Sequence, residues 1–284
     1  VLAAIGLWVY AGGIALAQPT TGDPDRRCLQ CHGQEHIGKL NPAERLSMVG
    51  TWLESEPRPA DAPSPDRTPT GSEPAVRPGL FVKKDALIGS VHKGVKCVEC
   101  HEDAARLPHE PKLNLRTCAT SCHEGAAKAF STGVHAESLR RGDPLAPTCA
   151  SCHGGHQIYG IGDRQSPQHR LNSIFLCADC HERHLKDTPG GYKPKRHIEA
   201  YLSSAHGKAV AEAGLVAAPT CTDCHSAHAV HPVSDPESPV HRSRIYTTCG
   251  SCHVGILAVY EKSLHGRLAA EGDARAPVCT DCHT

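Results

Sequence analysis

Residues 149–156 read CASCHGGH, and the five-residue pattern C-x-x-C-H at their start recurs along the chain. Seven copies have this spacing, and an eighth, CATSCH at 118–123, has one extra residue between its cysteines. Together these motifs use all 16 cysteines of the 284-residue chain. The cysteines are Cys28, Cys31, Cys97, Cys100, Cys118, Cys122, Cys149, Cys152, Cys177, Cys180, Cys221, Cys224, Cys249, Cys252, Cys279 and Cys282. The histidines that close the motifs are His32, His101, His123, His153, His181, His225, His253 and His283.

The motif suits covalent attachment of haem. Two thiols at this spacing reach the two vinyl groups on one edge of a haem, and the next residue turns an imidazole onto the iron. A disulfide framework gives no reason for a histidine after every second cysteine, and structural zinc draws four ligands from two such pairs. One extra residue in CATSCH still lets both sulfurs reach the same edge. The sequence therefore predicts eight covalently bound haems c, with iron as their metal.

The composition predicts that something other than side chains fills the interior. Aromatic residues make up 4% of the chain, whereas 26 glycines and 22 prolines indicate abundant turns. Lysine and arginine balance aspartate and glutamate at 30 each, which argues against a nucleic-acid partner. Seven motifs crowd into residues 97–283, so neighbouring haems are expected to touch. We expect a multihaem cytochrome c fold, mostly irregular coil with short α-helices packed around a haem chain, and little or no β-sheet.

Four segments are expected along the chain. Residues 1–17, VLAAIGLWVYAGGIALA, are apolar and uncharged and end in Ala-Leu-Ala, which predicts a signal peptide or an N-terminal anchor. Everything after them is then exported, periplasmic or extracellular, and membrane-anchored where that segment is kept. Residues 18–53 carry the first haem motif, 54–79 form a Pro-rich linker, and 80–284 form a seven-haem domain. Within that domain, Ala-rich helices are expected at about 124–141, 195–213 and 254–271, each ended by a glycine.

The seven-haem domain contains internal repeats, as architectures do whose single unit cannot bury its own surface. Residues 149–184 realign on 221–256, which pairs His156 with His228 and His169 with His241. Residues 118–153 realign on 249–283, which pairs His135 with His265. The last copy of C-H-x-x-H stops at Thr284, before its second histidine. We therefore expect the native chain to continue as x-His, followed by a further haem module, a membrane anchor or a cytochrome b domain.

Thirteen histidines outside the motifs are available for the distal side of the eight irons. Met48 is the only methionine, so at most one haem is His/Met. A histidine that recurs at a fixed offset beside a motif is predicted to ligate iron, and replacing His169 or His241 is expected to make one haem high spin. His36, His184, His197 and His231 are expected to be solvated surface side chains. The predicted distal ligands are His92, His109, His135, His156, His169, His206, His228, His241 and His265.

The patterns S-x-H-G…A-P-x-C-x-D-C-H and C-H-x-x-H…S-P-x-H in residues 80–284 resemble those of bacterial exported multihaem cytochromes c. The resemblance is to low-potential members that sit beside, or are fused to, a membrane cytochrome b. It implies electron transfer along a stacked haem chain from a quinol-side or periplasmic donor. It implies redox partner proteins as well, with a membrane cytochrome b or a quinol dehydrogenase as candidates. The scarcity of methionine independently predicts low potentials, because a Met ligand raises the potential relative to His.

Two other functions are compatible with the sequence. An octahaem oxidoreductase of nitrogen or sulfur compounds needs one haem with an open iron position and nearby acid–base groups. The chain has no C-x-x-C-K motif, and its thirteen spare histidines exceed the eight distal positions. A subunit of an extracellular conducting filament, or another homo-oligomer, is the second alternative. We expect an electron carrier rather than an enzyme, with no catalytic residues of its own.

Overall fold

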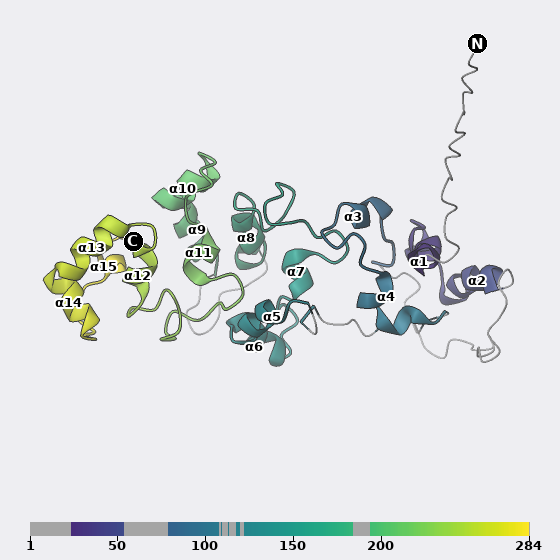
Figure 1. Cartoon of the computed structure of the whole chain (residues 1–284), viewed down its shortest axis with the longest axis horizontal. Helices are drawn as coiled ribbons and strands as arrows, with labels where there is room; N and C mark the ends of the chain where they lie inside the picture. Colours follow the sequence, from purple (N-terminus) through teal and green to yellow (C-terminus); the bar gives the residue numbers. More distant parts are fainter. Residues whose placement is uncertain are drawn as a thin grey trace, which may run out of the picture. The chain divides into compact units, whose positions relative to one another are not determined.

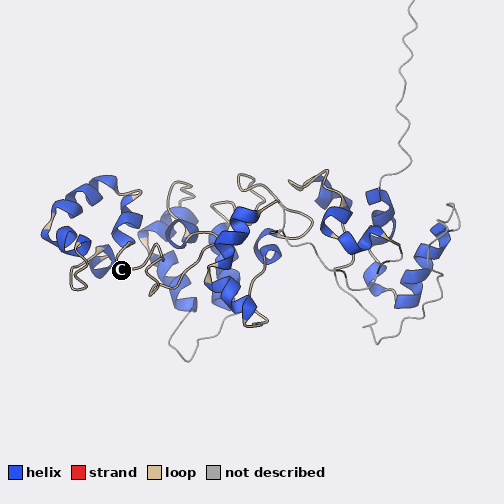
Figure 2. Ribbon diagram, turned by 60° about the horizontal axis from the view of Figure 1, so that its bottom comes forward, coloured by secondary structure: helices blue, strands red, loops and turns tan. Residues whose placement is uncertain are grey.

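The computed structural model describes residues 24–53, 79–107, 109, 113, 118–119, 122–183 and 194–283. Over these residues the chain forms short α-helices and two 3-10 helices joined by turns and coil, without a β-strand (Figures 1 and 2). The expectation of short helices and irregular coil is confirmed for this part of the chain. Residues 1–17, His184 and nearly all of the expected linker lie outside it. None of the described helices is long and apolar enough to cross a membrane.

The chain divides into two compact units, with the boundary between Phe81 and Val82. The first unit contains one C-x-x-C-H motif and the second contains the other seven. The helices of the second unit are α3 (Lys84–Ile88), α4 (Cys97–Cys100), η2 (Glu102–Ala105), α5 (Glu124–Ser131), α6 (Val134–Arg140), α7 (Cys149–His153), α8 (Ser173–Arg183), α9 (Pro194–Ser203), α10 (Ala205–Ala211), α11 (Cys221–His225), α12 (Ile245–Gly250), α13 (Val254–Lys262), α14 (Leu264–Ala270) and α15 (Cys279–Cys282).

The first unit packs two helices around its single motif. Helix α1 (Pro24–His32) contacts α2 (Pro42–Leu53), and the 3-10 helix η1 (Ile37–Lys39) lies between them in the chain. A reciprocal cap begins α2: the Glu44 N–H donates to Asn41 Oδ1 at 2.9 Å, and the Asn41 N–H donates to Glu44 Oε2 at 2.8 Å. The motif at the end of α1 is thereby held next to a helix with a defined start.

Each long helix expected in the second unit is two helices in the structure. The expected helix at 124–141 is α5 followed by α6, that at 195–213 is α9 followed by α10, and that at 254–271 is α13 followed by α14. The second helix of each segment ends at the expected glycine, because glycines 142, 214 and 272 adopt left-handed φ of 74°, 65° and 84°. Only the break in the middle of each segment was missed.

The break has the same cause in each segment. Gly133, Ser204 and Ser263 adopt extended backbone, with ψ of 168°, 163° and 164°, and so end one helix before the next begins. Ser204 and Ser263 then cap the new helix by accepting the N–H of the third residue along. A histidine stands two residues after each break. The break therefore presents a histidine in the first turn of a short helix.

Arg170 fixes one attachment helix to the segment before it. Its guanidinium donates to the carbonyls of Val216 (2.6 Å) and Ala218 (2.9 Å). It also pairs with the Asp223 carboxylate in α11 at 3.0 Å. Four acceptor oxygens, two from carbonyls and two from the Asp223 carboxylate, thus bind one planar guanidinium that is always charged.

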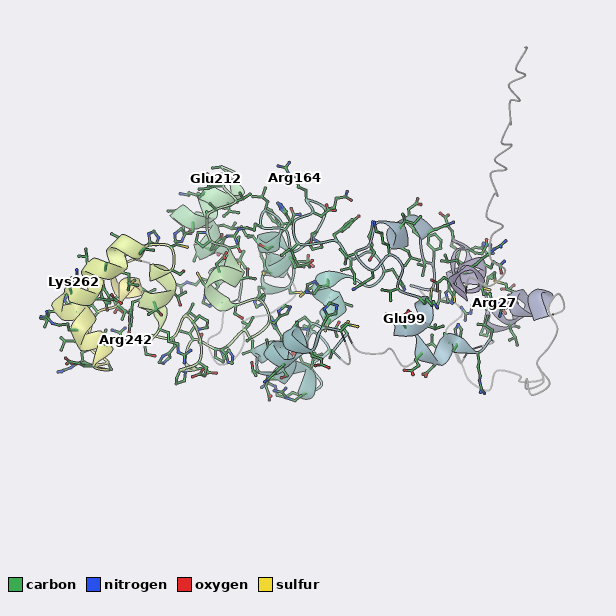
Figure 3. All side chains as sticks on the ribbon, viewed as in Figure 1. Arg27, Glu99, Arg164, Glu212, Arg242 and Lys262 are labelled. Atoms are coloured by element: carbon green, nitrogen blue, oxygen red, sulfur yellow. The ribbon has the colours of Figure 1, made fainter. Side chains whose placement is uncertain are left out.

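Arg242, labelled in Figure 3, repeats this arrangement 72 residues later. It donates to the carbonyls of Ala274 (3.1 Å) and Ala276 (2.6 Å) and pairs with Asp281 of α15 at 2.9 Å. The sequence repeat is therefore also a structural repeat. Each copy ends by clamping the next C-x-x-C-H helix in place.

The side-chain core of the described residues is small. Ten hydrophobic residues are buried there, whereas fourteen large hydrophobic side chains are exposed. The one cluster of buried residues joins α8 and α10 to the segment before α11. It consists of Ile174, Val210 and Ala218, with Leu171, Tyr201, Leu202 and Ala209 packed against it. Apolar surface remains beside the motifs for a large apolar group to cover.

Candidate functional site

In four motifs the two cysteines and the histidine lie in one turn of an α-helix. In α7 the cysteines at positions 149 and 152 and the histidine at 153 stand at i, i+3 and i+4, which are neighbours on one helix face. Helices α1, α8 and α11 contain their motifs in the same way. In α4 and α15 the helix ends at the second cysteine and the histidine caps it.

Three motif helices are capped by a residue inside the motif itself. The residue before the second cysteine is serine or aspartate, and its side chain accepts the N–H of the residue before the first cysteine. The bonds join Thr148 to Ser151 (2.9 Å), Thr220 to Asp223 (2.7 Å) and Val278 to Asp281 (2.7 Å). This cap holds both thiols on a formed turn without using either of them.

Five motif histidines of the second unit each lie beside one histidine from outside the motifs. The ring centroids are 5.9–6.2 Å apart in all five pairs. The pairs are His101 with His156, His123 with His92, His153 with His228, His181 with His135, and His253 with His206. Each pair therefore combines the histidine of a motif with a histidine that the sequence predicts as a distal ligand; we call the latter distal-type histidines.

This separation matches two imidazoles on opposite sides of one metal ion. A metal–imidazole bond is about 2 Å long and the nitrogen lies roughly 1 Å from the ring centre, so the two centroids stand about 6 Å apart. No group of three or more metal-binding side chains occurs among the described residues. A haem iron takes four nitrogens from the porphyrin and needs only two ligands from the protein. The centroid separations of the five pairs thus fit two imidazole ligands of one haem iron.

The partners follow a regular order along the chain. We number the motifs one to eight, at residues 28–32, 97–101, 118–123, 149–153, 177–181, 221–225, 249–253 and 279–283. His92, His135 and His206 follow motifs one, three and five and lie beside motifs three, five and seven. His156 and His228 follow motifs four and six and lie beside motifs two and four. Each distal-type histidine thus reaches two motifs away, forward or backward.

Two backbone hydrogen bonds join the forward and backward sets. We call the segments 90–92, 133–135, 204–206 and 263–265, each Ser/Gly-x-His, the histidine turns. In the first turn the Val91 N–H donates to Ile158 O at 2.8 Å, and in the second the Val134 N–H donates to Val230 O at 2.8 Å. Ile158 and Val230 each stand two residues after a backward-reaching histidine. One contact therefore positions two histidines for two different motifs.

Burial keeps several of these imidazoles in the neutral, metal-binding form. It lowers the pKa of His135, and together with neighbouring imidazoles it lowers the pKa of His153, His181 and His225. Neutral imidazole is the form that offers a lone pair to a metal. In the first unit His32 Nδ1 lies 2.7 Å from Leu80 O, which as a carbonyl can only accept. That bond makes Nδ1 the protonated nitrogen of His32, so a metal would bind at Nε2.

Thiols of successive motifs also meet. The hydrogen bond to Cys221 and burial both raise the pKa of Cys177. Burial and the neighbouring Cys279 raise the pKa of Cys249 to about 11. These neighbours join first cysteines to first and second to second, and Cys177 and Cys249 also lie near the second cysteine of the preceding motif. The neighbouring thiols are Cys118 and Cys149, Cys152 and Cys180, Cys177 and Cys221, Cys224 and Cys252, and Cys249 and Cys279. Motifs three to eight therefore follow one another in space in their sequence order.

Serine and glycine set the geometry of the third histidine turn. Ser204 Oγ accepts the Gly207 N–H at 3.1 Å and donates to Tyr201 O at 2.6 Å. A Cβ at Gly207 would overlap the Tyr201 carbonyl oxygen and come within 2.8 Å of the Leu202 Cα. Only glycine fits here, and the residue before it is His206.

We therefore expect Gly207→Ala to destabilise the haem-loaded protein by about 1–3 kcal/mol, because the added methyl meets backbone that cannot move aside. The matched control is Gly255→Ala in α13, where a Cβ has open space and alanine is the better helix former. Urea unfolding followed by circular dichroism measures both. Equal midpoints for the two variants would contradict the close packing at Gly207.

Three other predicted distal ligands, His169, His241 and His265, have no motif histidine beside them among the described ring contacts. His109 is half-buried. His169 Nδ1 accepts the Leu171 N–H at 3.3 Å, and His241 Nδ1 lies 2.7 Å from Ser243 Oγ and accepts the Ser243 N–H at 3.2 Å. These two rings are held within their own turns, next to Arg170 and Arg242. His265 is exposed and contacts no other histidine ring.

Two histidines expected to be surface residues have defined surroundings. His197 of α9 adds to burial in lowering the pKa of His181 and His225, so it lies near both motif imidazoles. The internal repeats do not identify His197, because α13, the segment that corresponds to α9, contains no histidine. His231 Nδ1 donates to the Asp235 carboxylate at 2.9 Å, and its Nε2 lies 3.5 Å from Thr132 Oγ1. His231 is thus a structural residue.

Comparison with protein-family models, with curated proteins and with solved structures found no match to this chain.

Proposed function

We propose that this chain is an exported multihaem c-type cytochrome that holds eight haems c and passes electrons along them. The five imidazole pairs, each with a metal-sized gap, carry this proposal. In each pair one imidazole belongs to a motif whose two thiols are placed to bind the same group. A pair of histidines brought together for packing alone has no reason to include an attachment residue every time.

The distribution of apolar side chains supports the same function. A porphyrin presents two broad apolar faces, and burying them requires apolar protein surface. The described residues keep fourteen large hydrophobic side chains exposed, among them Val91 beside His92 and Val254 next to His253. A buried side-chain core of ten residues, four of them alanine, is little for the described part of the chain. Eight macrocycles would supply the missing interior.

The order of the thiols supports transfer along a line. Each thiol contact between successive motifs brings two attachment edges together, so the bound groups would lie edge to edge from the third motif to the eighth. When bound, haem iron with two imidazole ligands exchanges one electron between Fe(III) and Fe(II) without changing ligands. The chain's residues hold these ligands in place, and the Leu80 carbonyl fixes the tautomer of His32. Their part is positioning rather than catalysis.

The remaining features of the function follow from this ligand set. Imidazole on both sides of the iron favours low potentials relative to a Met ligand. The donor and acceptor are redox proteins, and a membrane cytochrome b or quinol dehydrogenase is the donor that the sequence patterns favour. The 30 lysines and arginines are available to neutralise haem propionates. The site of action is the periplasm or the cell exterior, where haem c is assembled.

Electron paramagnetic resonance of the ferric, haem-loaded protein tests the function. We expect the haems of motifs two, three, four, five and seven to be low spin, because each iron has two imidazoles. A high-spin signal from one of these five would instead indicate an open iron and favour an octahaem oxidoreductase. Variants of each distal-type histidine assign the signal to its motif.

A further inference from the structure

The histidine turn that presents His265 is built like the third turn, which presents His206. Ser263 Oγ accepts the Gly266 N–H at 3.1 Å and donates to Tyr260 O at 2.6 Å. The Tyr260 hydroxyl donates to Pro277 O at 2.9 Å. The corresponding three bonds of the third turn are 3.1, 2.6 and 2.8 Å long. The two turns thus share the serine cap and the hydrogen bond from the tyrosine hydroxyl.

Gly266 repeats the close packing of Gly207 as well. A Cβ at Gly266 would overlap the Tyr260 carbonyl oxygen and come within 2.8 Å of the Glu261 Cα. A glycine forced by backbone contact, a capping serine and a tyrosine anchor make a specific local structure around His265. An ordinary surface histidine needs none of them.

The order of the pairs shows where this turn points. The first three histidine turns follow motifs one, three and five, and each places its histidine beside the motif two further on. His265 follows motif seven, so the same step leads past motif eight. Accordingly, the His265 ring contacts neither His253 nor His283 within the described part of the chain, and it is exposed.

We propose that His265 is an axial ligand for a haem iron that none of the eight motifs holds. The group is a haem c that has one imidazole of its own and lacks the second. Its source is either a further motif of the native polypeptide or a separate cytochrome that docks at this turn. This inference rests on the proposed function.

The surface around His265 suits such a ligand. Leu264, next to it, is 60% exposed, and the corresponding residue of the third turn is the smaller Ala205. Helix α13, which packs against α14, exposes Val254, Ile256 and Val259. These side chains offer apolar surface to one face or edge of a macrocycle.

A haem peptide tests the proposal: a short C-x-x-C-H peptide with one covalent haem, its own histidine and no distal ligand. Added to the haem-loaded chain, it is expected to turn low spin with one peptide bound per chain. His265→Ala should weaken this binding about 10-fold or more, since metal sites lose this much even from an outer partner. His241→Ala, whose ring is held within its own turn, should leave it unchanged.

Equal titrations for His265→Ala and the unaltered protein would overturn the inference. So would a high-spin haem in His265→Ala before any peptide is added, because His265 would then serve one of the eight haems. A haem count by pyridine haemochrome precedes the titration. A count of zero removes the proposed function, whereas eight haems with His265-independent binding overturn this inference alone.

Intact mass of the protein purified from its native cells separates the two sources. More than eight haems on one polypeptide assign the partner haem to a further motif of the same chain. Eight haems, together with loss of a co-purified cytochrome in His265→Ala, assign it to a separate protein. Eight haems with no cytochrome bound through His265 would contradict both sources.

Discussion

Replacing His228 with alanine is expected to leave one iron, that of motif four, high spin while all eight haems stay attached. The reason is the His153–His228 pair, whose rings are 6.1 Å apart and nearly parallel, with an interplanar angle of 20°. Alanine removes one of the two protein ligands but touches no thiol. Relative to the unaltered protein, electron paramagnetic resonance should show additional high-spin signal equal to one haem per chain, and the reduced protein should bind one additional carbon monoxide.

The matched variant is His241→Ala. Both histidines recur at the 72-residue offset, so recurrence alone predicts a ligand at both positions. The structure separates them, because His241 Nδ1 is engaged with Ser243 in its own turn. We expect His241→Ala to leave the low-spin haems of motifs two, three, four, five and seven unchanged. A high-spin haem in His241→Ala together with an unchanged spectrum in His228→Ala would show that the backward-reaching pairs are wrongly assigned.

Removing the haem of motif four is expected to divide the electron pathway. Cys149 lies against a thiol of motif three and Cys152 against a thiol of motif five, so motif four is the link between them. In the double variant Cys149→Ala, Cys152→Ala, a protein film attached to an electrode through a C-terminal tag should exchange electrons rapidly only with motifs five to eight. The haems of motifs two and three should respond far more slowly in fast-scan voltammetry.

The control removes an end instead of a middle link. Cys279→Ala with Cys282→Ala deletes the haem of motif eight, which is the last motif and has Cys249 of motif seven as a thiol neighbour. Attached by an N-terminal tag, this film should still exchange electrons rapidly with all of its remaining haems in the second unit. Rapid exchange with every haem in the motif-four variant would mean that electrons bypass the line of motifs.

Local sequence was sufficient for the ends of the three Ala-rich segments, whereas the helices formed by the motifs themselves were not among the predicted helices. The i, i+3, i+4 spacing places two thiols and an imidazole on one turn, and glycines 142, 214 and 272 stop the helices as expected. The break before each histidine turn was missed because Ser204 and Ser263 stand in Ala-rich, helix-favouring sequence. Their capping role becomes visible only with Gly207 and Gly266 packed against backbone.

Recurrence identified histidines without saying why they recur. The predicted set includes all five histidines that form ring pairs with a motif histidine in the described part of the chain, but not His197, which lies near His181 and His225. It also includes His169 and His241, which adjoin the arginines that clamp α11 and α15. A repeat preserves folding residues as faithfully as ligands. The step of two motifs between partners depends on long-range packing, such as Val134 against Val230, that no local pattern encodes.

The central claim is that every C-x-x-C-H and the CATSCH motif bind haem covalently. Intact mass spectrometry under denaturing conditions tests it most directly, on protein expressed with a c-type haem attachment system. We predict a mass equal to the expressed polypeptide plus eight haems, and one haem fewer for Cys118→Ala with Cys122→Ala. A mass equal to the bare polypeptide, or to the polypeptide with its thiols paired as disulfides, would contradict the claim.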